Sequence, residues 1–216
     1  MGKTVYSVVL TEEVVAAVDA LAYREGISRS RLIDRILAQY ACCDTPARQM
    51  ADIFAPIEQM VNLHGRLQLL LQPTEELLQL KSAVPYKYNP TVKYAVELHT
   101  ASLTSIGELR VTLRSQSAGL LCAMNEFYSL WAGLEERFFE DGAFLTYEAA
   151  NGRYLRVLRR PKVLKAAELG DAIAGYIDLF DAVMKGYFDA LPSKPDAVRR
   201  AVAVFEKTKH NNILGL

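Results

Sequence analysis

The stretch "TVYSVVLTEEVVAAVDALAYREGISRSRLIDRILAQY", residues 4–40, decides the fold of the N-terminal part of this 216-residue chain. It begins with a segment, Thr4–Leu10, whose side chains alternate with the period of two that is typical of a β-strand. A lone strand has two open edges and no partner nearby in its own sequence. The alternation places Tyr6, Val8 and Leu10 on one face and Lys3, Val5, Ser7 and Val9 on the other.

Two helices are predicted to follow this strand. The first begins after the N-cap Thr11, carries two glutamates where the helix dipole favours negative charge, and ends at Gly26. The second begins at Ser28. Its apolar stripe consists of Leu32, Ile33, Ile36, Leu37 and Tyr40. One strand and two helices of this size cannot bury a core alone. Two copies that pair Thr4–Leu10 antiparallel and interlock their helices can do so, and we therefore expect a homodimer.

The strand "VYSVVL", the acidic turn "TEE" and above all "GISRSRLIDRIL" resemble the ribbon–helix–helix superfamily of DNA-binding proteins, the Arc, MetJ and CopG relatives. The likeness covers roughly the first fifth of the chain. It implies that the paired ribbon enters the major groove of double-stranded DNA with Val5, Ser7 and Val9 facing the bases. It also implies that the second helix holds a phosphate at its start, where free backbone N–H groups attract anions. The phosphate-contacting residues would then be Lys3, Ser28, Arg29, Ser30 and Arg31.

The base-facing positions depart from the family pattern. They usually carry Arg, Lys, Thr, Asn or Gln, whereas here Val5 and Val9 can only touch thymine methyl groups and Ser7 alone can hydrogen-bond a base. Three interpretations follow from this. The chain is a transcriptional regulator, a plasmid-partition or mobilisation accessory protein that coats repeated sites, or a dimeric scaffold that uses the ribbon without binding DNA.

The middle of the chain has a helical pattern that begins at about Pro46 and includes apolar residues up to Val61. We expect this helical character to continue through "RLQLLLQPTEELLQLKS", with a break at Pro73. The proline-bounded segment "VPYKYNPT" then suggests a linker. The predicted organisation is a ribbon–helix–helix module at residues 1–44, a helical connector at 45–85, and a larger domain at 86–216.

The last of these parts is predicted to be an α+β domain with two β-hairpins and long helices. Residues 92–98 and 109–113 alternate with a period of two and predict an antiparallel pair. A helix is expected over about 117–139, and Asn151-Gly152 predicts a tight hairpin after it. Two further helices are expected, one over about 163–191 and one that opens at Pro195 and Asp196.

Composition limits the possible functions. Lys plus Arg number 25 and Asp plus Glu number 25, so any basic surface for DNA must be local. The local basic excess lies at Arg153, Arg156, Arg159 and Arg160. It is either a second patch for a DNA backbone or another acidic partner, or a solvated hairpin. Three cysteines suggest reduced thiols in a cytoplasmic protein. No apolar run approaches the roughly 18 residues of a membrane span.

We find no phosphate loop, no nucleophile elbow and no Cys or His pairs at metal spacing in the sequence. We therefore expect a protein that is not an enzyme and has no metal or cofactor. The second domain is expected to bind an effector or a protein partner. The function predicted from the sequence is that of a homodimeric DNA-binding transcriptional regulator.

Overall fold

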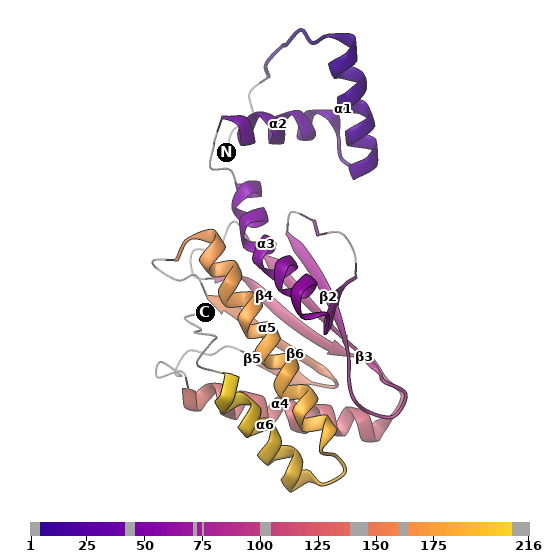
Figure 1. Ribbon diagram of the computed structural model, residues 1–216, viewed down its shortest axis with the longest axis vertical. Coiled ribbons are helices and arrows are strands. Elements are labelled where there is room, and N and C mark those ends of the chain that lie inside the picture. The colour runs from indigo at the N-terminus through magenta and orange to yellow at the C-terminus, as the bar shows by residue number, and fades with distance from the viewer. Residues whose placement is uncertain are drawn as a thin grey trace. The chain divides into compact units, whose positions relative to one another are not determined.

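The computed structural model describes residues 5–41, 46–70, 73–74, 76–99, 105–138, 147–159 and 164–208 (Figure 1). The chain divides into two compact units, Met1–Gln49 and Met50–Leu216. The N-terminal unit contains two helices and the first residues of a third. The C-terminal unit contains a β-sheet with helices packed on it.

Helices α1 (Glu12–Glu25) and α2 (Arg29–Tyr40) form the N-terminal unit as predicted. Thr11 is extended at the start of α1, and Gly26 ends it with a φ of 66°, a left-handed conformation that glycine adopts without strain. Residues 5–10 form neither helix nor strand in the single chain, and the first strand of the described residues begins at Leu67. A β-ladder needs a second strand, so the ribbon predicted at Thr4–Leu10 stays a prediction.

Six strands of the C-terminal unit form one antiparallel sheet in the order β1-β2-β3-β4-β6-β5. Their bounds are β1 Leu67–Leu69, β2 Leu77–Ala83, β3 Thr91–Leu98, β4 Ser105–Leu113, β5 Tyr147–Ala150 and β6 Arg153–Arg159. The predicted alternation is confirmed, since Tyr94, Val111 and Tyr154 are buried while Lys93 and Arg110 are exposed. The α+β class predicted from the sequence is therefore confirmed.

Helices cover the inner face of this sheet. They are α3 (Pro46–His64), α4 (Ala118–Phe138), α5 (Ala166–Asp189) and α6 (Lys194–Thr208). Figure 1 shows α5 crossing the strands, and its Phe180 lies at the centre of an aromatic cluster. The Phe180 ring centroid is 4.8 Å from that of Trp131, 5.3 Å from that of Phe127 and 5.7 Å from that of Tyr154. Such rings contribute a large buried apolar area to the core.

The prediction of a helical connector over residues 45–85 is correct for α3 but wrong beyond it, because β1 and β2 occupy Leu67–Leu69 and Leu77–Ala83. In β2, Leu78 and Leu80 are buried at alternate positions and pair with Val96 and Tyr94 of β3. Strand pairing and burial outweigh the helical propensity of Leu, Gln and Glu here.

Residues 84–90 connect β2 to β3 within the same sheet and form a turn, not a linker. Tyr88 and Asn89 have φ values of 67° and 45°, which reverse the chain direction. The two hairpins expected in the last part of the chain also belong to this one sheet, because β4 pairs with β6. Asn151 and Gly152 both have positive φ, so the predicted tight hairpin between β5 and β6 is confirmed.

Candidate functional site

Residues 5–10 carry the predicted base-facing side chains and are exposed along their whole length. Val5 is 96% exposed and Val9 is 100% exposed, and Ser7 is exposed between them. The opposite face of the predicted strand is uncovered too, with Tyr6 88% and Val8 60% exposed. Lys3 lies outside the described residues. Among the described residues of the N-terminal unit, none covers this extended apolar segment on either face.

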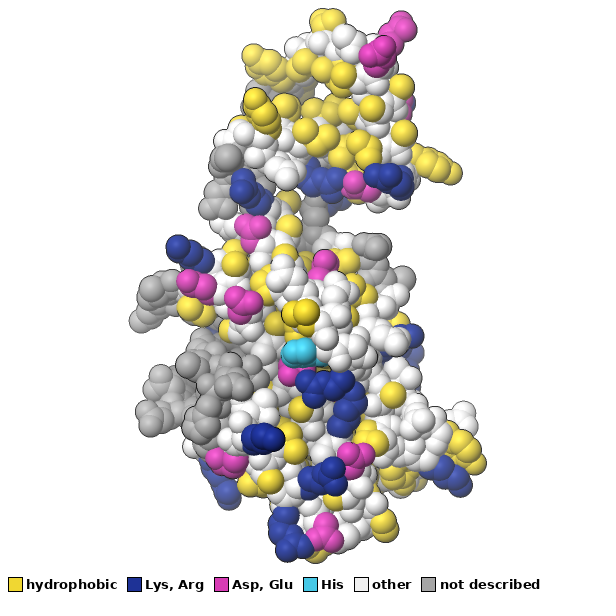
Figure 2. Space-filling model, viewed as in Figure 1, with side chains coloured by type: hydrophobic (Ala, Val, Ile, Leu, Met, Phe, Trp, Pro, Cys, Tyr) yellow, Lys and Arg dark blue, Asp and Glu magenta, His cyan; other side chains and the backbone are white. Residues whose placement is uncertain are grey.

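The core of the N-terminal unit is small. Its buried hydrophobic cluster consists of Val18, Ala22 and Leu32, with Leu21, Ile27 and Ile33 partly buried against it. Other apolar side chains of both helices stay exposed, and Figure 2 shows hydrophobic side chains gathered on this unit. They are Val14, Val15, Ile36, Leu37 and Tyr40. The apolar stripe predicted for the second helix is thus buried at one position and largely open at the others, as expected for half of a shared core.

The start of α2 carries the predicted phosphate contacts. The Ser28 hydroxyl accepts a hydrogen bond from the Arg31 backbone N–H at 3.3 Å and is therefore an N-cap. Arg29 forms an ion pair with Asp19 of α1. Ser30 and Arg31 are exposed, and the first turn of α2 contains no acidic residue. A phosphate could therefore approach the N-terminal end of α2 without meeting a carboxylate of its first turn.

The second basic patch is not a continuous surface. Arg156 points to the inner face of β6, where it is 1% exposed and its Nε lies 2.8 Å from Oε1 of Glu135. Its guanidinium carbon lies 4.8 Å from the centre of the Tyr176 ring. Its assignment to a DNA-contacting patch is wrong, because a buried cation paired in this way cannot reach a phosphate. Arg153 and Arg159 are exposed on β6, and Arg160 lies outside the described residues.

The pair formed by Glu135 and Arg156 belongs to a buried polar network. The Tyr154 hydroxyl donates to Glu135 at 2.5 Å, and Trp131 Nε1 donates to the Tyr176 hydroxyl at 2.9 Å. Burial, together with the nearby Glu135 carboxylate, raises the pKa values of Tyr154 and Tyr176 well above the ordinary range, so both phenols stay protonated. Burial lowers the pKa of Arg156, but the Glu135 carboxylate beside it raises this pKa, and the guanidinium stays charged.

Sequence reasoning missed this network. The sequence did contain a signal for it. Glu135 follows Trp131 by four residues and so lies on the apolar stripe of a predicted helix. Arg156 lies two residues after Tyr154 and two before Leu158, so it faces the same side of its strand as they do. Charges at two core positions need partners of opposite sign. The aromatic cluster around the pair favours a structural role for it.

The exposed face of the sheet carries a basic row that the sequence did not suggest. Strand register places Lys81 opposite Lys93, Lys93 opposite Thr112, and Thr112 opposite Arg153. None of the three cations has an ion pair within the described part of the chain, whereas Arg110 on the same face pairs with Glu97 and Glu108. Like charges directly opposite each other destabilise a sheet. We call Lys81, Lys93 and Arg153 the cationic row.

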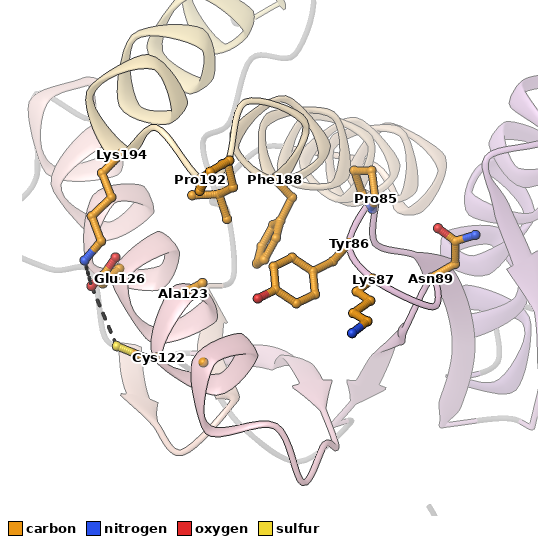
Figure 3. Close-up of a pocket in the computed structure, with 12 residues that line it drawn as sticks. Pro85, Tyr86, Lys87, Asn89, Cys122, Ala123, Glu126, Phe188, Pro192 and Lys194 are labelled. Atoms are coloured by element: carbon orange, nitrogen blue, oxygen red, sulfur yellow. Dashed lines mark hydrogen bonds and ion pairs between the residues drawn. The ribbon is translucent and has the colours of Figure 1, made fainter.

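A cavity of about 730 Å³ lies elsewhere in the C-terminal unit (Figure 3). It is lined by the turn between β2 and β3, the first turns of α4, the end of α5 and the start of α6. Figure 3 shows Tyr86, Phe188 and Pro192 together at its centre, with Glu126 and Lys194 on one side. Cys122 is exposed beside Glu126. This volume is typical of sites for small ligands.

Other chemistry has little support among the described residues. No group of three or more His, Cys, Asp or Glu side chains there is arranged to hold a metal ion. His64 Nδ1 lies 3.2 Å from Oδ1 of Asp178, which also accepts from Arg66.

None of the described helices is both long and apolar enough to cross a membrane. Comparisons with protein-family models, curated proteins and solved structures found no match.

Proposed function

We propose that this protein is a DNA-binding transcriptional regulator of ribbon–helix–helix type that acts as a homodimer. The observation that carries the proposal is the mismatch in the N-terminal unit between three buried hydrophobic side chains and a much larger exposed apolar set. In a dimer, Thr4–Leu10 pairs antiparallel with its copy, and the open stripes of α1 and α2 face those of the partner. Burial of this surface supplies the hydrophobic free energy that one copy lacks.

Contact with DNA would use the face of the ribbon that points away from the helices. Val5, Ser7 and Val9 would lie toward the bases, and the start of α2 would bind a backbone phosphate. Arg29 would share its guanidinium between Asp19 and that phosphate. The cationic row offers further phosphate contacts on the C-terminal unit, since its like charges are relieved by an anionic partner.

The first experiment is binding of the purified protein to its own upstream DNA and to unrelated DNA over a salt series. An autoregulating repressor is expected to bind the upstream DNA more tightly than unrelated DNA, with an affinity that falls steeply as the salt concentration rises. Light scattering on the same sample gives the oligomeric state, for which we expect a dimer. A monomer at all concentrations would refute the shared core.

Arg29→Ala tests the phosphate contact. We expect weaker binding to all DNA sequences and a salt slope smaller by about one. Arg35→Ala is the matched control, because Arg35 also lies on α2 and also pairs with an α1 carboxylate, that of Glu25. Equal effects of the two substitutions would assign the loss to helix packing and remove Arg29 from the interface.

One observation favours a second function, a dimeric scaffold that binds no DNA. The exposed side chains of Val5 and Val9 cannot hydrogen-bond base edges. A dimer that binds neither its own upstream DNA nor unrelated DNA at low salt would support the scaffold function. Residues 86–216 would then be the place to look for a protein partner.

A further inference from the structure

The cavity of the C-terminal unit exists because α4 begins with small side chains. Gly119, Cys122 and Ala123 line it at helical spacing, whereas Leu120, Met124 and Phe127 of the same helix are buried in the core. A Cβ atom added at Gly119 would meet only the Tyr86 hydroxyl, at 3.9 Å, so the space beside this glycine is open.

The floor of the cavity is apolar and aromatic. The Tyr86 ring packs edge to face on Phe188, with centroids 6.0 Å apart and an interplanar angle of 87°. Pro85, Leu191 and Pro192 extend this surface. Such a floor accepts a flat or compact apolar body, which gains free energy by leaving water.

The positive charges around the floor of the cavity outnumber the negative ones. Lys194 Nζ lies 2.5 Å from Oε1 of Glu126, and the hydrogen bond from Lys194 lowers the pKa of this carboxyl, so the pair is neutral overall. Lys87 has no carboxylate partner among the described residues and lies 5.2 Å from the centre of the Tyr88 ring. Asn89 also lines the cavity. The lining therefore carries one uncompensated positive charge.

We propose that this cavity binds a small amphipathic anion, an aromatic or similarly compact apolar carboxylate, with its apolar body on Tyr86 and Phe188 and its carboxylate at Lys87. Binding of such a molecule does not depend on the proposed function. Its role as the effector of a DNA-binding regulator does, and the two are measured separately.

The test uses the full-length protein without DNA, and naphthoate as the probe. Equilibrium dialysis gives the affinity, with naphthylmethanol and naphthylmethylamine as the neutral and cationic counterparts. Iodoacetamide, whose iodide the Cys122 thiolate displaces, reports occupancy of the cavity, because peptide mass spectrometry separates Cys122 from Cys42 and Cys43. At ten times its Kd, naphthoate should slow Cys122 alkylation about tenfold. We expect the carboxylate to bind more tightly than the alcohol, and the amine to bind least.

Two variants locate the probe. Lys87→Gln should weaken naphthoate binding about tenfold and leave naphthylmethanol unchanged, because only the carboxylate loses a charge-assisted hydrogen bond. Gly119→Leu should weaken binding of all three probes, because its side chain would project into the open space beside Tyr86. Gly133→Leu is its control on the same helix, since a Cβ atom there meets nothing within 4 Å. Unchanged thermal unfolding of each variant shows that the fold is intact.

Three results would overturn the proposal. The first is that neither naphthoate nor a panel of benzoate, indoleacetate and decanoate binds at up to about 10 mM. The second is equal affinity for the carboxylate and the amine, which would refute the charge match. The third is a naphthoate affinity that Gly119→Leu leaves unchanged, which would place the probe outside the cavity. If naphthoate binds as expected but DNA affinity does not respond to it, the effector role alone fails.

Discussion

Removal of Arg156 from the core gives the sharpest test of the buried network. Arg156 and Glu135 are each 1% exposed, and the Tyr154 hydroxyl also donates a hydrogen bond to this carboxylate. Arg156→Ala therefore leaves a buried charge without its counterion. Breaking a buried pair in this way costs about 3–5 kcal/mol of unfolding free energy. For a unit of this size the Tm should fall by about 6–20 °C.

Urea and thermal unfolding of the purified protein would measure this loss. Arg153→Ala is the matched control, because Arg153 lies on the same strand but is exposed, and its substitution should change stability by no more than about 0.5 kcal/mol. Replacing both partners, Glu135→Leu with Arg156→Met, should recover most of the stability, since no charge is then buried alone. The reasoning is refuted if Arg156→Ala is as mild as Arg153→Ala. A double variant as unstable as the single one would assign the loss to packing on Tyr176.

Two further substitutions test the surfaces proposed for assembly and DNA contact. Leu37→Glu should raise the dimer dissociation constant at least about tenfold in sedimentation experiments, because it places a charge in an apolar interface. Its control is Gln39→Glu on the same helix, which adds the same charge at a polar position and should leave the dimer intact. Lys93→Gln should lower the salt slope of DNA binding by about one, whereas the control Lys207→Gln on α6 should leave the slope unchanged. Equal slopes for both variants would remove the cationic row from the DNA interface.

Strong local signals in the sequence predicted much of the C-terminal fold. The alternation over residues 92–98 and 109–113 predicts β3 and β4 because one face of each strand is buried and the other is solvated. Asn151-Gly152 predicts its hairpin because both residues tolerate positive φ. The long apolar stripes likewise predict α4 and α5, which bury one face on the sheet.

Features that depend on distant partners could not be predicted in this way. Consecutive leucines before and after Pro73 fit a helical period as well as an alternating one, so β1 emerges only from its pairing with β2, and β2 from its pairing with β3. The same limit applies to the candidate sites. The cationic row depends on the register of four strands, and the cavity joins a turn, two helix starts and a helix end. Among the candidate sites, only the one on α1 and α2 is built from residues that lie within one short stretch of the sequence.

One edge of the sheet is formed by a short strand. β1 has three residues, whereas its neighbour β2 has seven. An edge of this length offers a second molecule only a few unpaired N–H and C=O groups. This edge is thereby guarded against edge-to-edge polymerisation into fibres. If copies of this chain do join strands, the pairing should occur at its N-terminal segment and stop at two, because a closed pair covers the apolar faces that drive it.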